Sequence, residues 1–216
     1  MKSKRTAGQI RVMLVDDHEM MRDALRNIIV LEPDLNVVAE VGSGRKAINS
    51  LRRANPDVVL MDASMPEMNG METTRRLRKL RPTLKIIGVT LYEQTTYLDE
   101  MIEAGASGYV LKSGAPSEII KAIRMVAKGG TYFAFSVPRR ATPSDGEKLS
   151  ERELSAEELA VVKLVAWGMT KTEVASSLNV SVGEVDAQRA GAMRKLGLRN
   201  RAELVRVANK RGWLES

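Results

Sequence analysis

Residues 58–70 read VVLMDASMPEMNG, a short apolar run that ends in an aspartate. The apolar residues before Asp62 are typical of a strand that is buried on both faces of a parallel sheet. Pro66 and Gly70 then interrupt the regular structure. Open α/β sheets bind their ligands at the carboxyl ends of their strands, so Asp62 is a candidate site residue. The competing interpretation is that Asp62 only caps the next helix.

Similar apolar runs recur through the first part of the chain. They predict strands at 10–15, 36–41, 58–61, 85–90 and 107–111. A stretch with apolar residues at helical spacing follows each strand, and these helices end near Pro33, Pro56, Pro82, Gly105 and Gly129. This alternation predicts an α/β fold with a five-stranded, doubly wound parallel sheet over residues 9–129.

A change of composition marks the end of this first domain. Residues 136–150, SVPRRATPSDGEKLS, combine prolines, a glycine and small polar residues, which indicates a linker over about 130–150. Only helical patterns follow, and we expect a small all-α domain over 151–216. Its helices are predicted at 156–167, 171–178, 182–196 and 200–210.

The net charge of the 216-residue chain is +7, and the charge is unevenly distributed. Between Arg189 and Arg211 the only acidic residue is Glu203, whereas the segment before it leans acidic. A local cationic face of this kind suits a polyanion such as nucleic acid. The basic residues of this span are Arg189, Arg194, Lys195, Arg199, Arg201, Arg206, Lys210 and Arg211.

Several classes of protein are disfavoured by composition. The chain has no cysteine, which excludes disulfides and thiolate chemistry. No apolar stretch approaches the roughly 20 residues of a membrane span, and the N-terminus MKSKRTAGQ lacks a signal-peptide core. We therefore expect a cytoplasmic protein that does not enter a membrane.

Asp16 and Asp17 follow the first predicted strand. In a parallel sheet the carboxyl ends of the first and third strands are neighbours, so both acids should converge with Asp62. Each close pair of carboxylates repels by about 4 kcal/mol at an effective dielectric constant of about 20. Such a cluster needs a cation, and all-oxygen ligands suit Mg²⁺.

Two further polar residues end neighbouring strands. Thr90 ends the fourth strand, and Lys112 follows the fifth. A hydroxyl can hydrogen-bond a phosphoryl oxygen, and an ammonium group can pair with Asp62 and later with the phosphoryl group. A carboxylate nucleophile, a metal, a lysine and a hydroxyl are the parts needed to transfer a phosphoryl group onto an aspartate.

Residues 10–128 resemble the receiver domain of bacterial response regulators, which has a flavodoxin-like fold. The resemblance rests on LVDDHEMMR (14–22), MDASMPEMNG (61–70), VT (89–90) and GYVLKS (108–113). It implies that a sensor histidine kinase phosphorylates Asp62, with Thr90 and Tyr109 as a switch pair and Lys112 as the phosphate-sensing base. It also implies a Mg²⁺ or Mn²⁺ site made by Asp16, Asp17, Asp62 and the backbone carbonyl of Ser64. The chain would then be no enzyme, apart from slow chemistry on its own aspartate.

Two enzyme interpretations are disfavoured. Residues 42–47, GSGRKA, satisfy a loose dinucleotide-binding pattern, but the turn where that pattern belongs holds two acids that would repel a pyrophosphate. A phosphatase of the haloacid dehalogenase type would need a second acid two residues after its nucleophile. This chain has Ser64 at that position.

Residues 167–205 contain a helix, a short turn at Asn179-Val180 and a second helix that Ser181 would cap. This pattern predicts a helix-turn-helix, whose second helix could enter a major groove. The segment 150–212 resembles the LuxR-type output domain, mainly through RKLGLRNRAEL at 194–204. The whole chain therefore resembles a two-component response regulator of the NarL/FixJ type. That resemblance implies binding to promoter DNA and a homodimer after phosphorylation.

The residues expected to face the groove depart from the family pattern. Glu184, Asp186 and Gln188 stand where the family usually has a threonine, a lysine and a histidine. An acid can accept a hydrogen bond from cytosine but repels phosphates, so the phosphate contacts would fall to basic residues. Those basic residues are Arg189, Arg194, Lys195, Arg199 and Arg201.

Two output hypotheses follow from these departures. In the first, phosphorylation frees the C-terminal domain to dimerise and bind double-stranded DNA. In the second, the acidic recognition helix has lost ordinary DNA binding, and the domain acts through contacts with other proteins.

Overall fold

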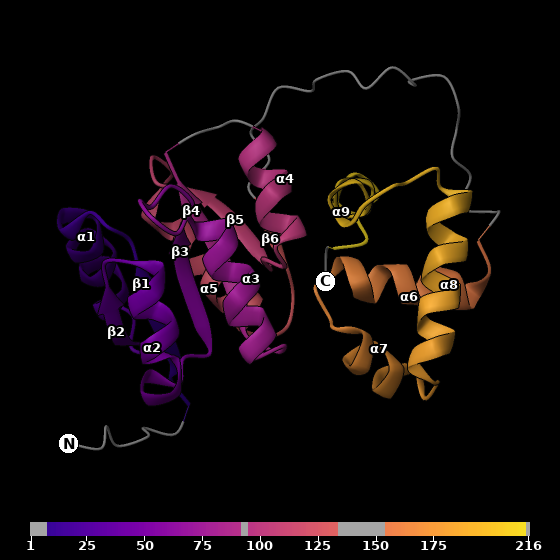
Figure 1. The fold of residues 1–216 in the computed structure, drawn as a ribbon, viewed down its shortest axis with the longest axis horizontal. Helices are drawn as coiled ribbons and strands as arrows, with labels where there is room; N and C mark the ends of the chain where they lie inside the picture. The colour runs from indigo at the N-terminus through magenta and orange to yellow at the C-terminus, as the bar shows by residue number, and fades with distance from the viewer. Residues whose placement is uncertain (1–7, 92–94, 134–153, 215–216) are drawn as a thin grey trace.

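The structure is a computed structural model that describes residues 8–91, 95–133 and 154–214 (Figure 1). The first part is an α/β domain built on one parallel sheet with the strand order β2-β1-β3-β4-β5-β6. Its strands are β1 (Ile10–Val15), β2 (Leu35–Val41), β3 (Val58–Asp62), β4 (Lys85–Thr90), β5 (Gly108–Leu111) and β6 (Tyr132–Phe133). The prediction of a doubly wound parallel sheet is confirmed.

The predicted number of strands was wrong by one. The sheet has six strands, because Tyr132 and Phe133 pair with Gly108 and Tyr109 of β5. These two residues fall inside the segment predicted as a linker. A two-residue strand after Gly129-Gly130 is too short to show an alternating pattern, so no periodicity in the sequence predicts it. Residues 134–150 of the predicted linker lie outside the described residues.

Helices cover both faces of the sheet. On one face α1 (Glu19–Val30) and α5 (Pro116–Ala127) pack against strand residues such as Val12 and Leu14. The other face is covered by α2 (Gly44–Ala54), α3 (Gly70–Leu80) and α4 (Thr95–Glu103). Alternate residues of each strand thus enter two separate cores, which explains the continuous apolar runs in the sequence.

The strand register aligns the carboxyl ends of the central strands. Asp62 in β3 lies beside Val89 of β4, and Thr90 at the end of β4 lies beside Leu111 of β5. The residue after Val15 in β1 is Asp16, and Val15 pairs with Met61. Side chains that are far apart in the sequence therefore meet at one edge of the sheet.

The second part is a four-helix domain with its own apolar core. Its helices are α6 (Ala156–Ala166), α7 (Lys171–Leu178), α8 (Val182–Lys195) and α9 (Arg201–Lys210). A reciprocal capping box begins each of α6, α7 and α8, through Ser155, Thr170 and Ser181. Between α7 and α8, Asn179 adopts the left-handed conformation (φ 54°), which makes the tight turn of a helix-turn-helix.

The two domains contact each other along α4 and α9 (Figure 1). The buried residues Ala202 and Val205 of α9 belong to the same apolar cluster as α4. The Arg201 guanidinium donates to the carbonyl oxygens of Ile102 (2.8 Å) and Ala106 (3.1 Å), at the end of α4. We call this set of contacts the α4–α9 interface.

Two acids of α4 complete the interface. Asp99 forms an ion pair with Arg206, and Glu103 accepts a hydrogen bond of 2.8 Å from the backbone N–H of Ala202.

Among the helices of the described ranges, none is long and apolar enough to cross a membrane.

A glycine at the start of α3 allows close packing beneath Asp62. A Cβ at Gly70 would lie 2.1 Å from the backbone oxygen of Asp62 and 2.8 Å from Cα of Ala63. We expect Gly70→Ala to destabilise the first domain by about 1–3 kcal/mol, as overpacking usually does. Denaturant unfolding followed by far-ultraviolet circular dichroism measures this change.

Gly183→Ala is the matched control, because it makes the same substitution in open space. Its nearest neighbour would be Oγ of Ser181 at 3.8 Å, so it should stabilise α8 by about 1 kcal/mol. Both tryptophans, Trp167 and Trp213, lie in the C-terminal domain, and their fluorescence follows that domain separately. Equal stability of wild type and Gly70→Ala would contradict the packing argument.

Candidate functional site

Three acids and a lysine meet at the carboxyl edge of the sheet. The Lys112 ammonium lies 2.6 Å from Oδ2 of Asp16 and 3.0 Å from Oδ2 of Asp62. Asp16 and Asp62 are 1% and 3% exposed, so this ion pair is buried. Asp17 stands beside them and is partly exposed. The strand register thus brings these residues together, as their positions after the strands predict.

Backbone groups hold the carboxylates in place. The N–H of Ser64 donates to Oδ1 of Asp62 (3.1 Å), and the N–H of His18 donates to Oδ1 of Asp16 (2.9 Å). Each bond fixes one carboxylate oxygen and leaves the other directed at Lys112. A buried carboxylate needs such partners, because an unpaired buried charge is strongly destabilising.

Burial and pairing act against each other on the protonation of this cluster. Burial raises the pKa of Asp62, and the hydrogen bonds from Ser64 and Lys112 oppose that shift. Burial alone would lower the pKa of Lys112, but its bonds to Asp16 and Asp62 outweigh it and the pKa is raised. Lys112 therefore stays charged and serves as the counter-ion of both carboxylates.

The acidic cluster has the donors that a divalent cation requires. One carboxylate oxygen from each of Asp16, Asp17 and Asp62, with a ring nitrogen of His18, lie within 4.8 Å of one another. Opposite ligands of an octahedral Mg²⁺ are about 4.2 Å apart, so this spacing fits. Oδ1 of Asp17 is buried and accepts no hydrogen bond from any described residue. Such an oxygen is suited to a metal.

The structure places His18 at the N-cap of α1, directly after the acidic pair. Its Nδ1 is 3.2 Å from Oδ1 of Asp17 and 3.4 Å from Oδ1 of Asp16. The side chain is mostly exposed, and it would pair with the acids only when protonated. The position of His18 directly after the acidic pair was the signal for this proximity.

Thr90 lies beside Lys112, whose backbone N–H donates to the Thr90 carbonyl oxygen at 2.6 Å. Both Thr90 and Tyr109 are buried. Burial raises the pKa of Tyr109 to about 12, and a hydrogen bond with the Thr90 side chain opposes that shift. Tyr109 lies inside the domain at 3% exposure, so Thr90 and Tyr109 are already in contact before any phosphorylation.

Gly88 connects the switch pair to α4. A Cβ at this position would lie 2.9 Å from both Cδ2 of Tyr109 and Cε of Met101. Only a glycine allows the tyrosine ring and the α4 methionine to approach β4 this closely. Met101 is fully buried, so a shift of the tyrosine ring would press directly on α4.

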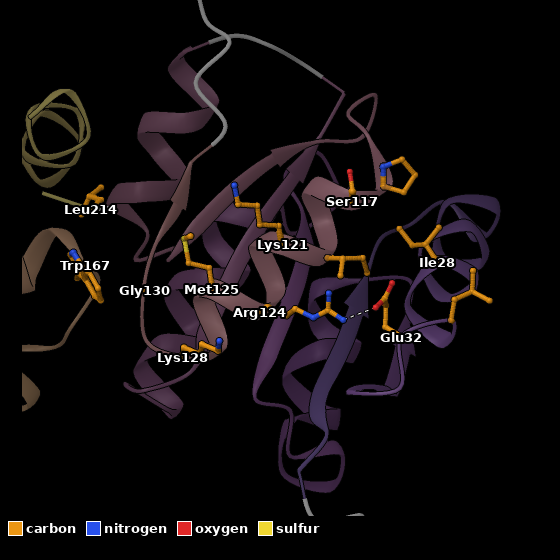
Figure 2. A pocket seen from close by; sticks show the side chains of 13 residues that line it. Ile28, Glu32, Ser117, Lys121, Arg124, Met125, Lys128, Gly130, Trp167 and Leu214 are labelled. Atoms are coloured by element: carbon orange, nitrogen blue, oxygen red, sulfur yellow. Dashed lines mark hydrogen bonds and ion pairs between the residues drawn. The ribbon is translucent and has the colours of Figure 1, made fainter. Parts of the chain in front are cut away.

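A separate cavity of about 780 Å³ runs along the outer side of α5 (Figure 2). Apolar side chains and three cations, Lys121, Arg124 and Lys128, line it. Arg124 is paired with Glu32 (2.5 Å) and Asp34 (2.6 Å). The cavity contains none of the predicted site residues, so it is distinct from the acidic cluster.

The acids of α8 are already engaged within the C-terminal domain. Oε2 of Glu184 accepts hydrogen bonds from the backbone N–H (2.8 Å) and the hydroxyl (2.7 Å) of Ser181, which lower the pKa of Glu184. Glu184 is therefore a helix-capping residue, and the spacing Ser181-x-x-Glu184 was the signal for it. Asp186 pairs with Lys171 at 2.6 Å, and Lys171 was not predicted to be a functional residue.

The other residues predicted to contact DNA divide into two groups. Arg194 and Arg199 are exposed, and Gln188 and Arg189 are partly exposed. Lys195 instead pairs with Glu158 (2.7 Å), whereas Arg201 lies in the α4–α9 interface. Burial lowers the pKa of Arg201 to about 10. Arg201 cannot contact DNA in this arrangement, because the receiver-like domain covers it.

The comparisons with known proteins agree with this geometry. The family profile described as "Response regulator receiver domain" matches residues 12–124, and that described as "Bacterial regulatory proteins, luxR family" matches residues 149–208. Response regulator UvrY of Escherichia coli is 34% identical over 207 residues, which cover 94% of this chain and 95% of UvrY. Nitrate/nitrite response regulator protein NarP of Escherichia coli is 35% identical over 206 residues, covering 90% of this chain and 92% of NarP.

Among solved structures, the RcsB response regulator of Salmonella typhimurium is similar over 94% of this chain and 99% of RcsB. The TM-score is 0.58 and the identity 29%. These relatives are response regulators and transcriptional regulatory proteins rather than enzymes. This agrees with the expectation that the chain does not turn over an external substrate. A receiver domain joined to a LuxR-type domain implies regulation of transcription that phosphorylation controls. The chain therefore belongs to the two-component response regulators of the NarL/FixJ type.

Proposed function

We propose that Asp62 accepts a phosphoryl group from a sensor histidine kinase, and that this event controls binding of the output domain to double-stranded promoter DNA. The observation that carries the proposal is the buried cluster of Asp62, Asp16 and Lys112 with Thr90 beside it. A protein with this role acts in the cytoplasm, as the sequence led us to expect.

In the proposed reaction a carboxylate oxygen of Asp62 attacks the phosphorus of a phosphohistidine. The bond from phosphorus to the imidazole nitrogen breaks as the new bond from phosphorus to oxygen forms, and the imidazole leaves. Lys112, which now neutralises Asp62, is placed to neutralise the transferred group instead. Attack by water on the phosphoryl group would later restore Asp62.

A divalent cation would assist this transfer. Mg²⁺ or Mn²⁺, when bound by Asp16, Asp17, Asp62 and the backbone carbonyl of Ser64, would supply positive charge for the phosphoryl oxygens. The spacing of the carboxylate oxygens supports such a site. The phosphoryl group itself adds a charge of about −1.5 to −2, which the acids could not tolerate without cations.

We infer that Thr90 carries the signal from the acidic cluster. Its hydroxyl now bonds with Tyr109, and a phosphoryl oxygen on Asp62 would compete for that hydroxyl. Tyr109 would then repack against Gly88 and Met101, which displaces α4. Because α4 holds α9 through Asp99 and Glu103, this displacement would loosen the α4–α9 interface.

The released output domain would bind DNA through its helix-turn-helix. Exposed cations at Arg194 and Arg199 and the surface residues Gln188 and Arg189 support this role. A solved structure of RcsB, to which this chain is similar, holds two RcsB dimers bound to two parallel DNAs. A homodimer after phosphorylation is part of the proposal. Val30 and Leu31, which are 70% and 78% exposed at the end of α1, offer an apolar surface for it.

A second candidate output is contact with another protein. It is favoured by the acidic start of α8 and by Asp186, which would oppose DNA phosphates. The capping role of Glu184 weakens this alternative. That acid stabilises the start of α8, so its presence is explained without a protein partner. We therefore propose DNA binding as the output.

Asp62→Asn tests the phosphoacceptor. With a small phosphodonor such as acetyl phosphate, we expect wild type to gain one phosphoryl group and the variant none, measured by intact mass. Wild type should bind duplex DNA more tightly after treatment, whereas the variant should not respond. Ser64→Ala, which keeps the backbone N–H, is the control and should behave as wild type.

The same binding assay, repeated over a salt series, separates the two outputs. DNA binding through phosphates should give a log–log slope of about −0.9 for each phosphate contact. A slope near zero for the phosphorylated full-length chain would exclude DNA and leave the protein-contact output.

Removal of Lys112 tests the cation site. The Lys112 ammonium would repel a divalent cation held by the same carboxylates by several kcal/mol at an effective dielectric constant of about 20. We expect Lys112→Met to tighten Mg²⁺ binding by about tenfold or more, read as stabilisation against heat in a Mg²⁺ titration. Lys112→Arg should not show this gain, and weaker Mg²⁺ binding by Lys112→Met would contradict the site.

Loss of a receiver-side contact tests the α4–α9 interface without altering the output domain. Asp99→Asn removes the partner of Arg206, and we expect DNA binding by the unphosphorylated chain to rise about three- to fivefold. Gel-shift titrations measure this change. The control is Glu100→Gln, an exposed acid on the same helix, and an equal rise in both variants would exclude the interface as the cause.

A further inference from the structure

An ion pair links the two helices of the helix-turn-helix. Nζ of Lys171 lies 2.6 Å from Oδ1 and 2.8 Å from Oδ2 of Asp186. Lys171 is the first residue of α7, and Asp186 lies in the second turn of α8. Both side chains are half exposed, at 50% and 47%, so the pair lies at the surface.

The pair lies on the face of α8 that is free to meet a ligand. Val185 and Ala192 are buried and mark the inner face of the helix. Gly183, Asp186 and Ala190 follow one another at helical spacing on the opposite, exposed face. The ammonium of Lys171 is thus held at the edge of the surface that would enter a major groove.

Asp186 is the acid of α8 whose charge is not used for capping. Glu184 is bound to Ser181 and satisfies the first turn of the helix. Within the part of the chain that the structure describes, Asp186 makes its hydrogen bond and ion pair with Lys171, across to the other helix. Gly183 and Ala190 add no charge beside it, whereas the partly exposed Arg189 lies one turn further along α8.

The pair is weak enough to exchange. Exposed ion pairs contribute about 0–1 kcal/mol, and salt screens them. A phosphate of DNA would offer Lys171 an alternative anion, and each such contact releases counterions. As long as Asp186 holds the ammonium, however, that contact is not available, and the carboxylate itself repels phosphates.

We propose that Lys171 is a DNA-phosphate-binding residue that Asp186 keeps from binding DNA non-specifically. This inference rests on the proposed DNA-binding function and names a contact within it. Asp186 thereby acts as a specificity residue, because it lowers affinity for the phosphate backbone that every sequence shares. The removal of Asp186 should make the output domain bind DNA more tightly and less selectively.

A double-mutant cycle on the phosphorylated full-length chain tests the proposal. Wild type, Asp186→Asn, Lys171→Met and the double variant are titrated with a short duplex of mixed sequence over a salt series. We expect Asp186→Asn to tighten binding about five- to tenfold at low salt and to steepen the log–log slope by about 0.9. Lys171→Met alone should change affinity less than twofold, and in the double variant it should cancel most of the gain.

Glu157→Gln is the charge-matched control, because Glu157 is an exposed acid at the start of α6. It should leave affinity and slope unchanged. An equal gain from Asp186→Asn with and without Lys171 would overturn the proposal, since simple repulsion would then explain it. The proposal would also be overturned if Lys171→Met lost as much affinity for DNA as the removal of a phosphate contact. Lys171 would then already bind DNA in wild type despite Asp186.

The cycle also separates this proposal from the proposed function. Binding by Asp186→Asn but not by wild type would support the role of Asp186 and refute DNA binding as the native output. Binding by wild type without any gain in Asp186→Asn would refute only the inference. The absence of salt-dependent binding in all variants would refute both.

Discussion

The pairing of one ammonium group with two buried carboxylates is the constraint on which this molecule depends. Asp16 and Asp62 lie at the ends of adjacent strands, where their carboxylates would repel each other. Nζ of Lys112 lies 2.6 Å from Asp16 and 3.0 Å from Asp62 and offsets that repulsion. Three strands must end at one edge for this to occur, so the pairing requires the parallel sheet. It also leaves a site that is stable yet responsive, because a new phosphoryl anion would change the partner that Lys112 prefers.

Much of this site could be predicted from the sequence, because its residues directly follow apolar strands whose ends must meet. Asp16, Asp62, Thr90 and Lys112 are of this kind, and no long-range information was needed to bring them together. The C-terminal helices were also predicted closely, since serine or threonine caps and glycines mark their ends. The strand β6 was missed, because two residues carry no periodic signal.

What could not be predicted is which partners the charged residues choose. Asp186 looked like a groove-facing acid, yet it pairs with Lys171 of the preceding helix. Arg201 looked like a DNA contact, yet it binds the carbonyl groups at the end of α4, ninety-five or more residues away in sequence. Local patterns predict helices and strands well, but a charge on a helix surface has several possible partners, and only the packed arrangement selects one.

The α4–α9 interface also has a consequence for how the protein responds to its own abundance. Asp99 and Arg206 belong to one chain, so their encounter is governed by a fixed effective concentration rather than by the number of molecules. Binding to an operator, in contrast, depends on how many molecules are present. In the proposed mechanism, the closed arrangement would resist overproduction only up to a point. The strength of the α4–α9 interface would then set the cellular level above which the unphosphorylated protein begins to occupy its targets.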